Sequence, residues 1–222
     1  MKADRASASL TPRVLGLAGA LFGPGLIAWG ASRFASGRIE LQTVWLAAFI
    51  GLTIFVICMG RVEGLGWREL GFRGFTWVSV PLSILLSAFL IFVFGPFAYW
   101  LATQLPSHGF DEPIAALRHL PRWYLMVSVV LVAASEEWLY RGYAIERLES
   151  LTGSTWGAGA VSLGAFALAH LPVWGAGPSV TTLLSGGVLT ALYLWRRDVS
   201  FLIVAHVATD FYGIVVAPPS AV

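Results

Sequence analysis

Six ionisable residues lie within, or at the edge of, long apolar stretches of this sequence. They are Glu136, Glu137, Arg141, His170, His206 and Asp210. A charged side chain at the centre of a bilayer costs about 2.5–3.5 kcal/mol on insertion scales, so such residues usually face the interior of a helix bundle and take part in function. Two histidines, three acids and one arginine, spread over three stretches, are therefore the candidate functional set.

The adjacent acids in "SEEWLYR" are not expected to be equivalent. On an α-helix, residues four apart are neighbours, whereas adjacent residues diverge by about 100°. Glu137 and Arg141 are four apart with the acid first, which is the favourable order for an ion pair. Glu136 points elsewhere and is free to face a cavity.

The other candidates also form pairs at helical spacing. Phe166 and His170 share one helix face, and Pro172 is expected to end that helix. His206 and Asp210 share a face further along the chain. Three helices would therefore each present polar groups to a common interior.

The elements that must position these residues are membrane helices. The chain has 222 residues, of which 57% are hydrophobic and only 12% charged, against about 25% charged residues in a soluble domain. The apolar blocks are continuous and do not alternate as barrel strands do. We predict one all-α integral-membrane domain over 1–222, a polytopic transmembrane bundle of about seven spans (six to eight) without a β-sheet. The spans are expected at about 14–31, 41–60, 77–100, 123–141, 156–172, 178–195 and 199–217.

The distribution of basic residues predicts a cytoplasmic N-terminus, because cytoplasmic loops carry the excess of Lys and Arg. The inner side would then hold ten of them, Lys2, Arg5, Arg13, Arg61, Arg68, Arg73, Arg141, Arg147, Arg196 and Arg197. The outer side would hold four, Arg33, Arg38, Arg118 and Arg122. Localisation in the plasma membrane is expected, and no basic tract suggests nucleic acid as a partner.

Three further features have structural interpretations. The single cysteine, Cys58, excludes a disulfide framework and is expected to be buried. The segment 60–75 alternates arginines with apolar residues, so it is expected either to lie on the inner surface or to form a basic loop. The segment 102–122 is expected to be a solvated loop with Asp111, Glu112, His108 and His119.

Three motifs together resemble a known family. "EEWLYR" fits Glu-Glu-x-x-x-Arg, "FALAH" fits Phe-x-x-x-His, and "HVATD" fits His-x-x-x-Asn/Asp, in that order within 123–217. This set is similar to that of the CAAX protease and bacteriocin-processing (CPBP or Abi) family, which includes the type II CAAX prenyl endopeptidases.

The resemblance implies an intramembrane glutamic endopeptidase that needs no cofactor. Glu136, together with His170, would activate a water molecule, while Glu137 would pair with Arg141 and hold the helix in place. His206 and residue 210 would stabilise the oxyanion. The prenyl endopeptidases carry Asn at this last position, whereas this chain has Asp210, which is expected to orient His206 while the histidine ring donates.

Other functions for the same residues remain open. Glu136, His170 and His206 could ligate Zn²⁺ in an intramembrane metalloprotease. The ionisable residues could form the relay of a proton-coupled transporter, or the chain could be a non-catalytic membrane or immunity scaffold. The expected partners are the lipid bilayer and a membrane protein or peptide substrate, which could be lipidated.

Overall fold

The structure is a computed structural model that describes residues 10–34, 39–104 and 111–217. Within these residues every regular element is a helix and no strand is present, as predicted. The elements are α1 (Leu10–Phe34), α2 (Ile39–Val62), α3 (Ser79–Phe89), η2 (Leu90–Phe94), α4 (Gly95–Thr103), α5 (Asp111–Arg118), α6 (Arg122–Glu136), η3 (Glu137–Ile145), α7 (Glu146–Thr152), α8 (Thr155–Trp174), α9 (Ala176–Arg196), α10 (Ser200–Asp210) and η4 (Phe211–Val216). The three η segments are π-helical and continue neighbouring α-helices.

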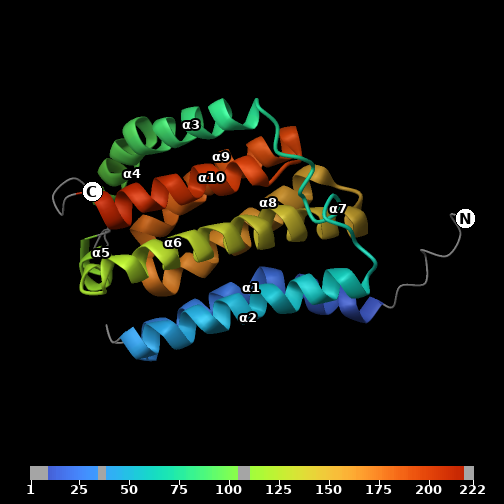
Figure 1. Cartoon of the computed structure of the whole chain (residues 1–222), viewed down its shortest axis with the longest axis horizontal. Helices are drawn as coiled ribbons and strands as arrows, with labels where there is room; N and C mark the ends of the chain where they lie inside the picture. The colour runs from blue at the N-terminus through green and yellow to red at the C-terminus, as the bar shows by residue number, and fades with distance from the viewer. Residues whose placement is uncertain (1–9, 35–38, 105–110, 218–222) are drawn as a thin grey trace, which may run out of the picture.

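The helices run back and forth between two ends of an elongated bundle (Figure 1). Each of the seven apolar stretches predicted from sequence coincides with a helix or a helix continued by a π-helical segment. Four of these, α1, α2, Ser79–Thr103 and α8, are long and apolar enough to cross a membrane, and α10 with η4 forms a shorter apolar helix. The fold is a polytopic helical bundle.

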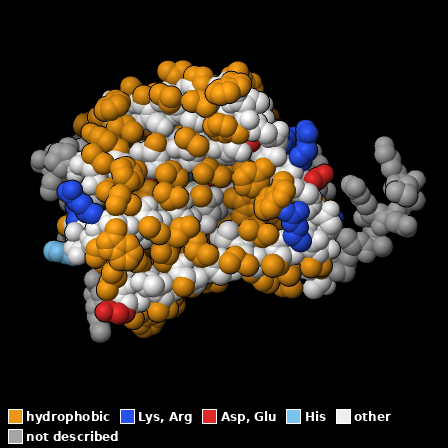
Figure 2. All heavy atoms as spheres, viewed as in Figure 1, with side chains coloured by type: hydrophobic (Ala, Val, Ile, Leu, Met, Phe, Trp, Pro, Cys, Tyr) orange, Lys and Arg blue, Asp and Glu red, His pale blue; other side chains and the backbone are white. Residues whose placement is uncertain are grey.

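The surface has the character of a membrane protein. Hydrophobic side chains cover the flank of the bundle in view, while charged side chains gather toward the two ends (Figure 2). Phe22, Ile54, Leu85 and Phe92 each expose more than half of their surface. Large apolar side chains outside a packed core are stable when lipid surrounds them.

The continuous helix formed by α6, η3 and α7 lies at the centre of the bundle. Leu139, Tyr140, Tyr143 and Ala144 of η3 are fully buried. Helices α1 and α8 pack against η3, and α10 packs against α6. The helix predicted to end at residue 141 therefore continues to Thr152, and the "EEWLYR" motif lies inside this helix.

The longer central helix corrects the count of basic residues. Arg141 is 1% exposed and lies within the bundle, so it does not belong to an inner loop. Without Arg141 the number of basic residues on the predicted inner side falls from ten to nine, against four on the outer side. The direction of the asymmetry is unchanged.

Four other expectations differ from the structure. Cys58 is exposed on the flank of α2, because it points away from the neighbouring helices. Pro172 lies inside α8, which ends at Trp174 and is capped by Gly175, where φ is +78°. Part of the predicted loop 102–122 forms α5. His119 is exposed, His108 lies outside the described residues, and α5 includes Asp111 and Glu112.

The segment between α2 and α3 also differs from its expectation. It was expected to lie on the surface or to form a basic loop, but part of it is buried. It forms turns, and Leu70 within it is 0% exposed. The indole nitrogen of Trp138 donates to the Leu70 carbonyl over 3.1 Å. Gly71, with φ of +90°, lies so close to Gly142 that a Cβ on Gly71 would be 2.6 Å from the Gly142 Cα atom. The segment is therefore inserted against the central helix.

Candidate active site

Three helices bring the predicted site residues together. The junction of α6 and η3 carries the two adjacent glutamates and the arginine, α8 carries Phe166 and His170, and α10 carries His206 and Asp210. Contacts between these side chains connect all three helices. The structure therefore assembles residues that are up to 74 positions apart, from Glu136 to Asp210.

Glu137 is the buried hub of the site. Its Oε1 atom accepts from Arg141 Nη1 over 3.0 Å and faces His206 Nδ1 at 2.8 Å. The Glu137 and Arg141 side chains are 0% and 1% exposed. The predicted Glu137–Arg141 ion pair is present, and the contact from Glu137 to His206 on α10 is additional to it. A buried ion pair needs such further hydrogen bonds to offset desolvation.

The guanidinium of Arg141 connects the hub to α8 and α9. Arg141 Nη2 donates to the Gly186 carbonyl over 3.2 Å. The guanidinium carbon lies 4.2 Å from the centre of the Phe166 ring, which is the geometry of a cation–π contact. Gly186 permits this approach, because a Cβ there would meet Phe166 at 2.9 Å and Arg141 Nη2 at 3.1 Å.

Phe166 also fixes the orientation of His170. The Phe166 carbonyl lies 2.8 Å from His170 Nδ1, and the two ring centres are 4.6 Å apart. A carbonyl oxygen only accepts, so Nδ1 carries the proton and Nε2 is the other, reactive nitrogen. His170 Nε2 lies 3.9 Å from Glu136 Oε1. Glu136 and His170 therefore face each other, as their predicted joint role requires.

Both ring nitrogens of His206 face carboxylates. Nδ1 faces Glu137 at 2.8 Å, and Nε2 lies 3.4 Å from Asp210 Oδ2. The Asp210 side chain is 35% exposed, compared with 12% for His206. Since Glu137 engages Nδ1, only Nε2 is directed toward a group outside the buried hub.

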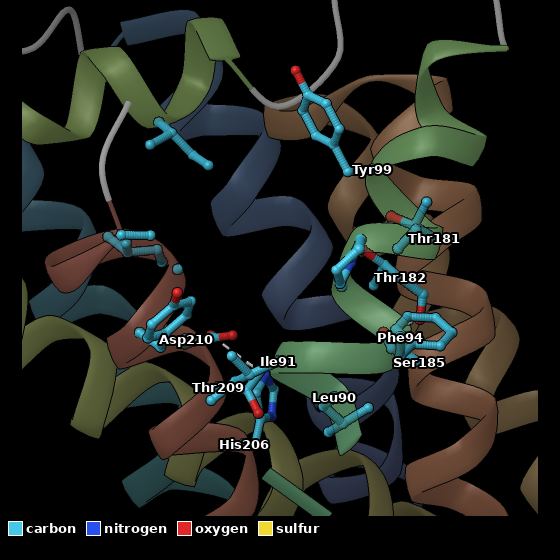
Figure 3. Close-up of a pocket in the computed structure, with 18 of the residues that line it drawn as sticks. Leu90, Ile91, Phe94, Tyr99, Thr181, Thr182, Ser185, His206, Thr209 and Asp210 are labelled. Atoms are coloured by element: carbon cyan, nitrogen blue, oxygen red, sulfur yellow. Dashed lines mark hydrogen bonds and ion pairs between the residues drawn. The ribbon is translucent and has the colours of Figure 1, made fainter. Parts of the chain in front are cut away.

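A cavity of about 570 Å³ adjoins these residues. It is lined by His170, His206 and Asp210, but by neither glutamate of the motif. Figure 3 shows two facing walls, one from α10 with His206, Thr209 and Asp210, and one from α9 with Thr181, Thr182 and Ser185. Most of the remaining lining is apolar, and its largest share comes from η2 and α4, including Ile91 and Phe94. An extended, largely apolar segment with a few polar groups suits such a cavity.

The zinc alternative requires several ligating side chains around one point. Among the described residues, no group of three or more His, Cys, Asp or Glu side chains is placed so that it could hold a metal ion. Glu136, His170 and His206 form separate contacts: Glu136 faces His170, whereas His206 bonds Glu137. These three residues do not form a common ligand set in this arrangement.

Two features of the site are absent from the predictions made on sequence. The contact between Glu137 and His206 joins residues 69 positions apart, so helical spacing gives no signal for it. The cavity wall of η2 and α4 is formed by apolar residues that a sequence alone does not separate from lipid-facing ones. By contrast, the pairs within one helix were all identified from their spacing.

The comparison with protein families agrees with this geometry. Residues 118–212 match the model of the family described as type II CAAX prenyl endopeptidase Rce1-like. This part of the chain is therefore similar to the Rce1-like family. The match includes all three motifs and supports a protease, which argues against the transporter and scaffold alternatives. No curated protein and no solved structure matches the chain.

Proposed function

We propose that the protein is an intramembrane endopeptidase in which Glu136 and His170 activate a water molecule. The observation that carries the proposal is the 3.9 Å between Glu136 Oε1 and His170 Nε2 beside the large cavity. This separation is too long for a direct hydrogen bond and suits a water molecule bonded to both groups. The water would donate one hydrogen to each group and direct its oxygen lone pair toward a substrate carbonyl carbon.

The proposed reaction is a general acid–base hydrolysis. Glu136 takes a proton from the water as the oxygen bonds to the carbonyl carbon, which gives a tetrahedral oxyanion. The protonated Glu136 then gives that proton to the amide nitrogen as the carbon–nitrogen bond breaks, and an acid and an amine are released. Base catalysis of this kind contributes about 10²–10⁴-fold in rate.

His206 is the proposed donor to the oxyanion. Its Nδ1 is held by Glu137, so Nε2 is the nitrogen that can donate into the cavity, next to Asp210. Oxyanion donors act best when they are fixed before the reaction, and the buried Glu137–Arg141 pair supplies such a fixed support. Asp210 would orient the ring and balance its charge.

The proposed substrate is a membrane-associated or lipid-modified protein or peptide. The cavity combines an apolar wall on η2 and α4 with hydroxyl groups on α9, which suits a backbone segment entering beside an apolar group. We further propose a plasma-membrane location with the N-terminus in the cytoplasm. The reaction is proposed to require no cofactor, so elemental analysis of the active, chelator-treated protein should detect no stoichiometric metal.

The deciding experiment compares membrane peptides from cells that produce the wild type, Glu136→Gln or Glu69→Gln. Glu69 lies on an exposed turn away from the cavity and serves as the matched control. We expect an uncleaved membrane protein to accumulate with Glu136→Gln alone, and its cleavage by purified protein to slow by about 10²–10⁴-fold. Full cleavage by a folded Glu136→Gln variant would overturn the role of Glu136.

A further inference from the structure

A second cavity, of about 270 Å³, is lined by Arg68, Glu69, Arg73, Glu146 and Arg147. None of these residues lines the larger cavity. They belong to the segment between α2 and α3 and to α7, which lie together at one end of the bundle (Figure 1). We call this second cavity the arginine pocket. Its three arginines and two glutamates leave one excess positive charge.

The carboxylates of the arginine pocket are already engaged. Glu146 Oε2 accepts from Arg73 over 2.9 Å, while Glu146 Oε1 accepts from Tyr193 over 2.9 Å and from Arg197 over 3.2 Å. Glu69 accepts from the Gly66 amide over 3.1 Å. These acids therefore have little capacity to neutralise the other two arginines of the pocket.

Arg147 is buried with unused donors. It is 8% exposed, and its Nε atom has no hydrogen-bond partner among the described residues. Its Nη1 atom reaches Glu63 Oε2 only at 3.5 Å, longer than the 2.7–2.9 Å of a strong charge-assisted bond. Glu63 is also shared with Arg13 and Tyr143. A buried donor without a partner costs about 1–3 kcal/mol or more, so an anion beside Arg147 would stabilise the pocket.

Arg68 supplies a second available guanidinium. It is exposed and forms no ion pair within the described part of the chain. Guanidinium groups bind phosphate oxygens through two parallel hydrogen bonds, which makes arginine the preferred residue at phosphate sites. A volume of about 270 Å³ is below the roughly 300–1,000 Å³ of pockets for drug-sized ligands, so it suits a phosphate with a short linker.

The surroundings of the pocket indicate a lipid. Trp67, Phe75 and Trp77 belong to the same segment and are 54%, 50% and 92% exposed. The Arg61 guanidinium lies 4.2 Å from the centre of a Trp67 ring. Aromatic and basic side chains in this mixture are typical of the boundary between headgroups and acyl chains. The pocket would therefore lie at the level where lipid phosphates are most concentrated.

We infer that the arginine pocket binds the phosphate of an anionic phospholipid through Arg68, Arg73 and Arg147. The lipid would neutralise the excess charge and connect the segment 63–78 to α7. Because this segment packs on the central helix through Leu70 and Gly71, bound lipid stabilises this end of the bundle, opposite α4 and α5 (Figure 1).

The test measures lipid binding to the full-length protein in detergent, without reference to proteolysis. Phosphatidylglycerol, phosphatidylcholine and soluble glycerol phosphate are titrated while the melting temperature and the retained lipid are recorded. We expect phosphatidylglycerol to raise the melting temperature and to be retained, and the other two to have little effect. Equal effects of both lipids would overturn the inference. If soluble glycerol phosphate had the same effect as phosphatidylglycerol, the pocket would bind a free phosphate group, and the claim that its ligand is a lipid would be wrong.

Variants then assign the binding to the pocket. Arg68→Gln should weaken phosphatidylglycerol binding about fivefold, since one basic residue near a membrane surface contributes about 1 kcal/mol. Arg122→Gln, an exposed arginine at the other end of the bundle, is the matched control and should bind as the wild type does. Arg68 is exposed, so its variant should fold; unchanged affinity in that variant would overturn the site.

Discussion

At the residue scale, the two adjacent glutamates have different environments and therefore different tasks. Glu137 is 0% exposed and bonded to Arg141 and His206 through one oxygen, whereas Glu136 is 13% exposed and faces His170 across 3.9 Å. A carboxylate bound by an arginine and a histidine is poorly suited to accept another proton. A carboxylate without such a partner is suited to it, so the structure separates a supporting acid from a reactive one.

The supporting role of Glu137 predicts a loss of stability. Removing one partner of a buried ion pair leaves an uncompensated charge and typically costs about 3–5 kcal/mol. Glu137→Gln should therefore lower the melting temperature in detergent strongly, while Glu136→Gln should change it little. Because Arg141 and Glu137 act on each other, Arg141→Gln combined with Glu137→Gln should cost clearly less than the sum of the two single variants. Additive losses would show that the pair is not coupled.

The orienting role proposed for Asp210 predicts tolerance of an amide. Asp210→Asn keeps a carbonyl oxygen that can accept from His206 Nε2, which lies 3.4 Å from Asp210 Oδ2. We expect this variant to keep substantial activity, within about tenfold of the wild type, while Asp210→Ala loses more. Cleavage of the substrate found by membrane peptide comparison is the measurement. Complete inactivity of a normally folded Asp210→Asn variant would mean that the negative charge itself is required.

At the element scale, the central helix is held in place at its polar end by interactions across the bundle. The segment 63–78 contacts it where Gly71 meets Gly142, and a Cβ on Gly142 would lie 2.8 Å from the Leu70 carbonyl. The Gly71 carbonyl also accepts from the Val199 amide over 2.9 Å, near the start of α10. One short segment thus links the central helix, which carries Glu136, to α10, which carries His206.

A second link at this end predicts a dependence on pH. Glu149 of α7 lies outside the apolar part of the bundle, and hydrogen bonds from Arg197 lower its pKa. A carboxylate with a lowered folded-state pKa adds stability above its unfolded pKa, about 4.3, and loses it as pH falls through the folded value. The melting temperature of the wild type should exceed that of Glu149→Gln at pH 7, and the difference should shrink below about pH 4.3.

The control for this pH profile is Glu69→Gln. Within the residues that the structure describes, Glu69 bonds only to a neighbouring backbone amide, so its replacement should leave the melting temperature close to that of the wild type at neutral and at acidic pH. A difference between wild type and Glu149→Gln that stays constant from pH 7 down to about pH 2, below the unfolded and folded pKa values of such a carboxylate, would contradict the link to Arg197. The measurement is thermal unfolding in one detergent with matched ionic strength.

At the scale of the whole molecule, the features that could be predicted from the sequence are those that depend on composition and on local spacing. Continuous apolar blocks indicated the helices, and the pairs Glu137–Arg141, Phe166–His170 and His206–Asp210 followed from a four-residue period. The contact from Glu137 to His206 and the insertion of Leu70 join distant parts of the chain. Such contacts depend on how helices pack in three dimensions, which local periodicity does not encode.

The arrangement of the whole bundle also predicts its orientation in the membrane. Arg13, Arg68, Arg147 and Arg197 lie at the end where α1 begins, whereas Arg33, Arg118 and Arg122 lie at the opposite end (Figure 1). Cytoplasmic regions carry the excess of basic residues, so the first end should be cytoplasmic. In a Cys58→Ser background, His119→Cys should react with a membrane-impermeant maleimide in intact cells. Trp77→Cys, at the other end and 92% exposed in the wild type, should react only after the membrane is opened, and the reverse pattern would invert the proposed topology.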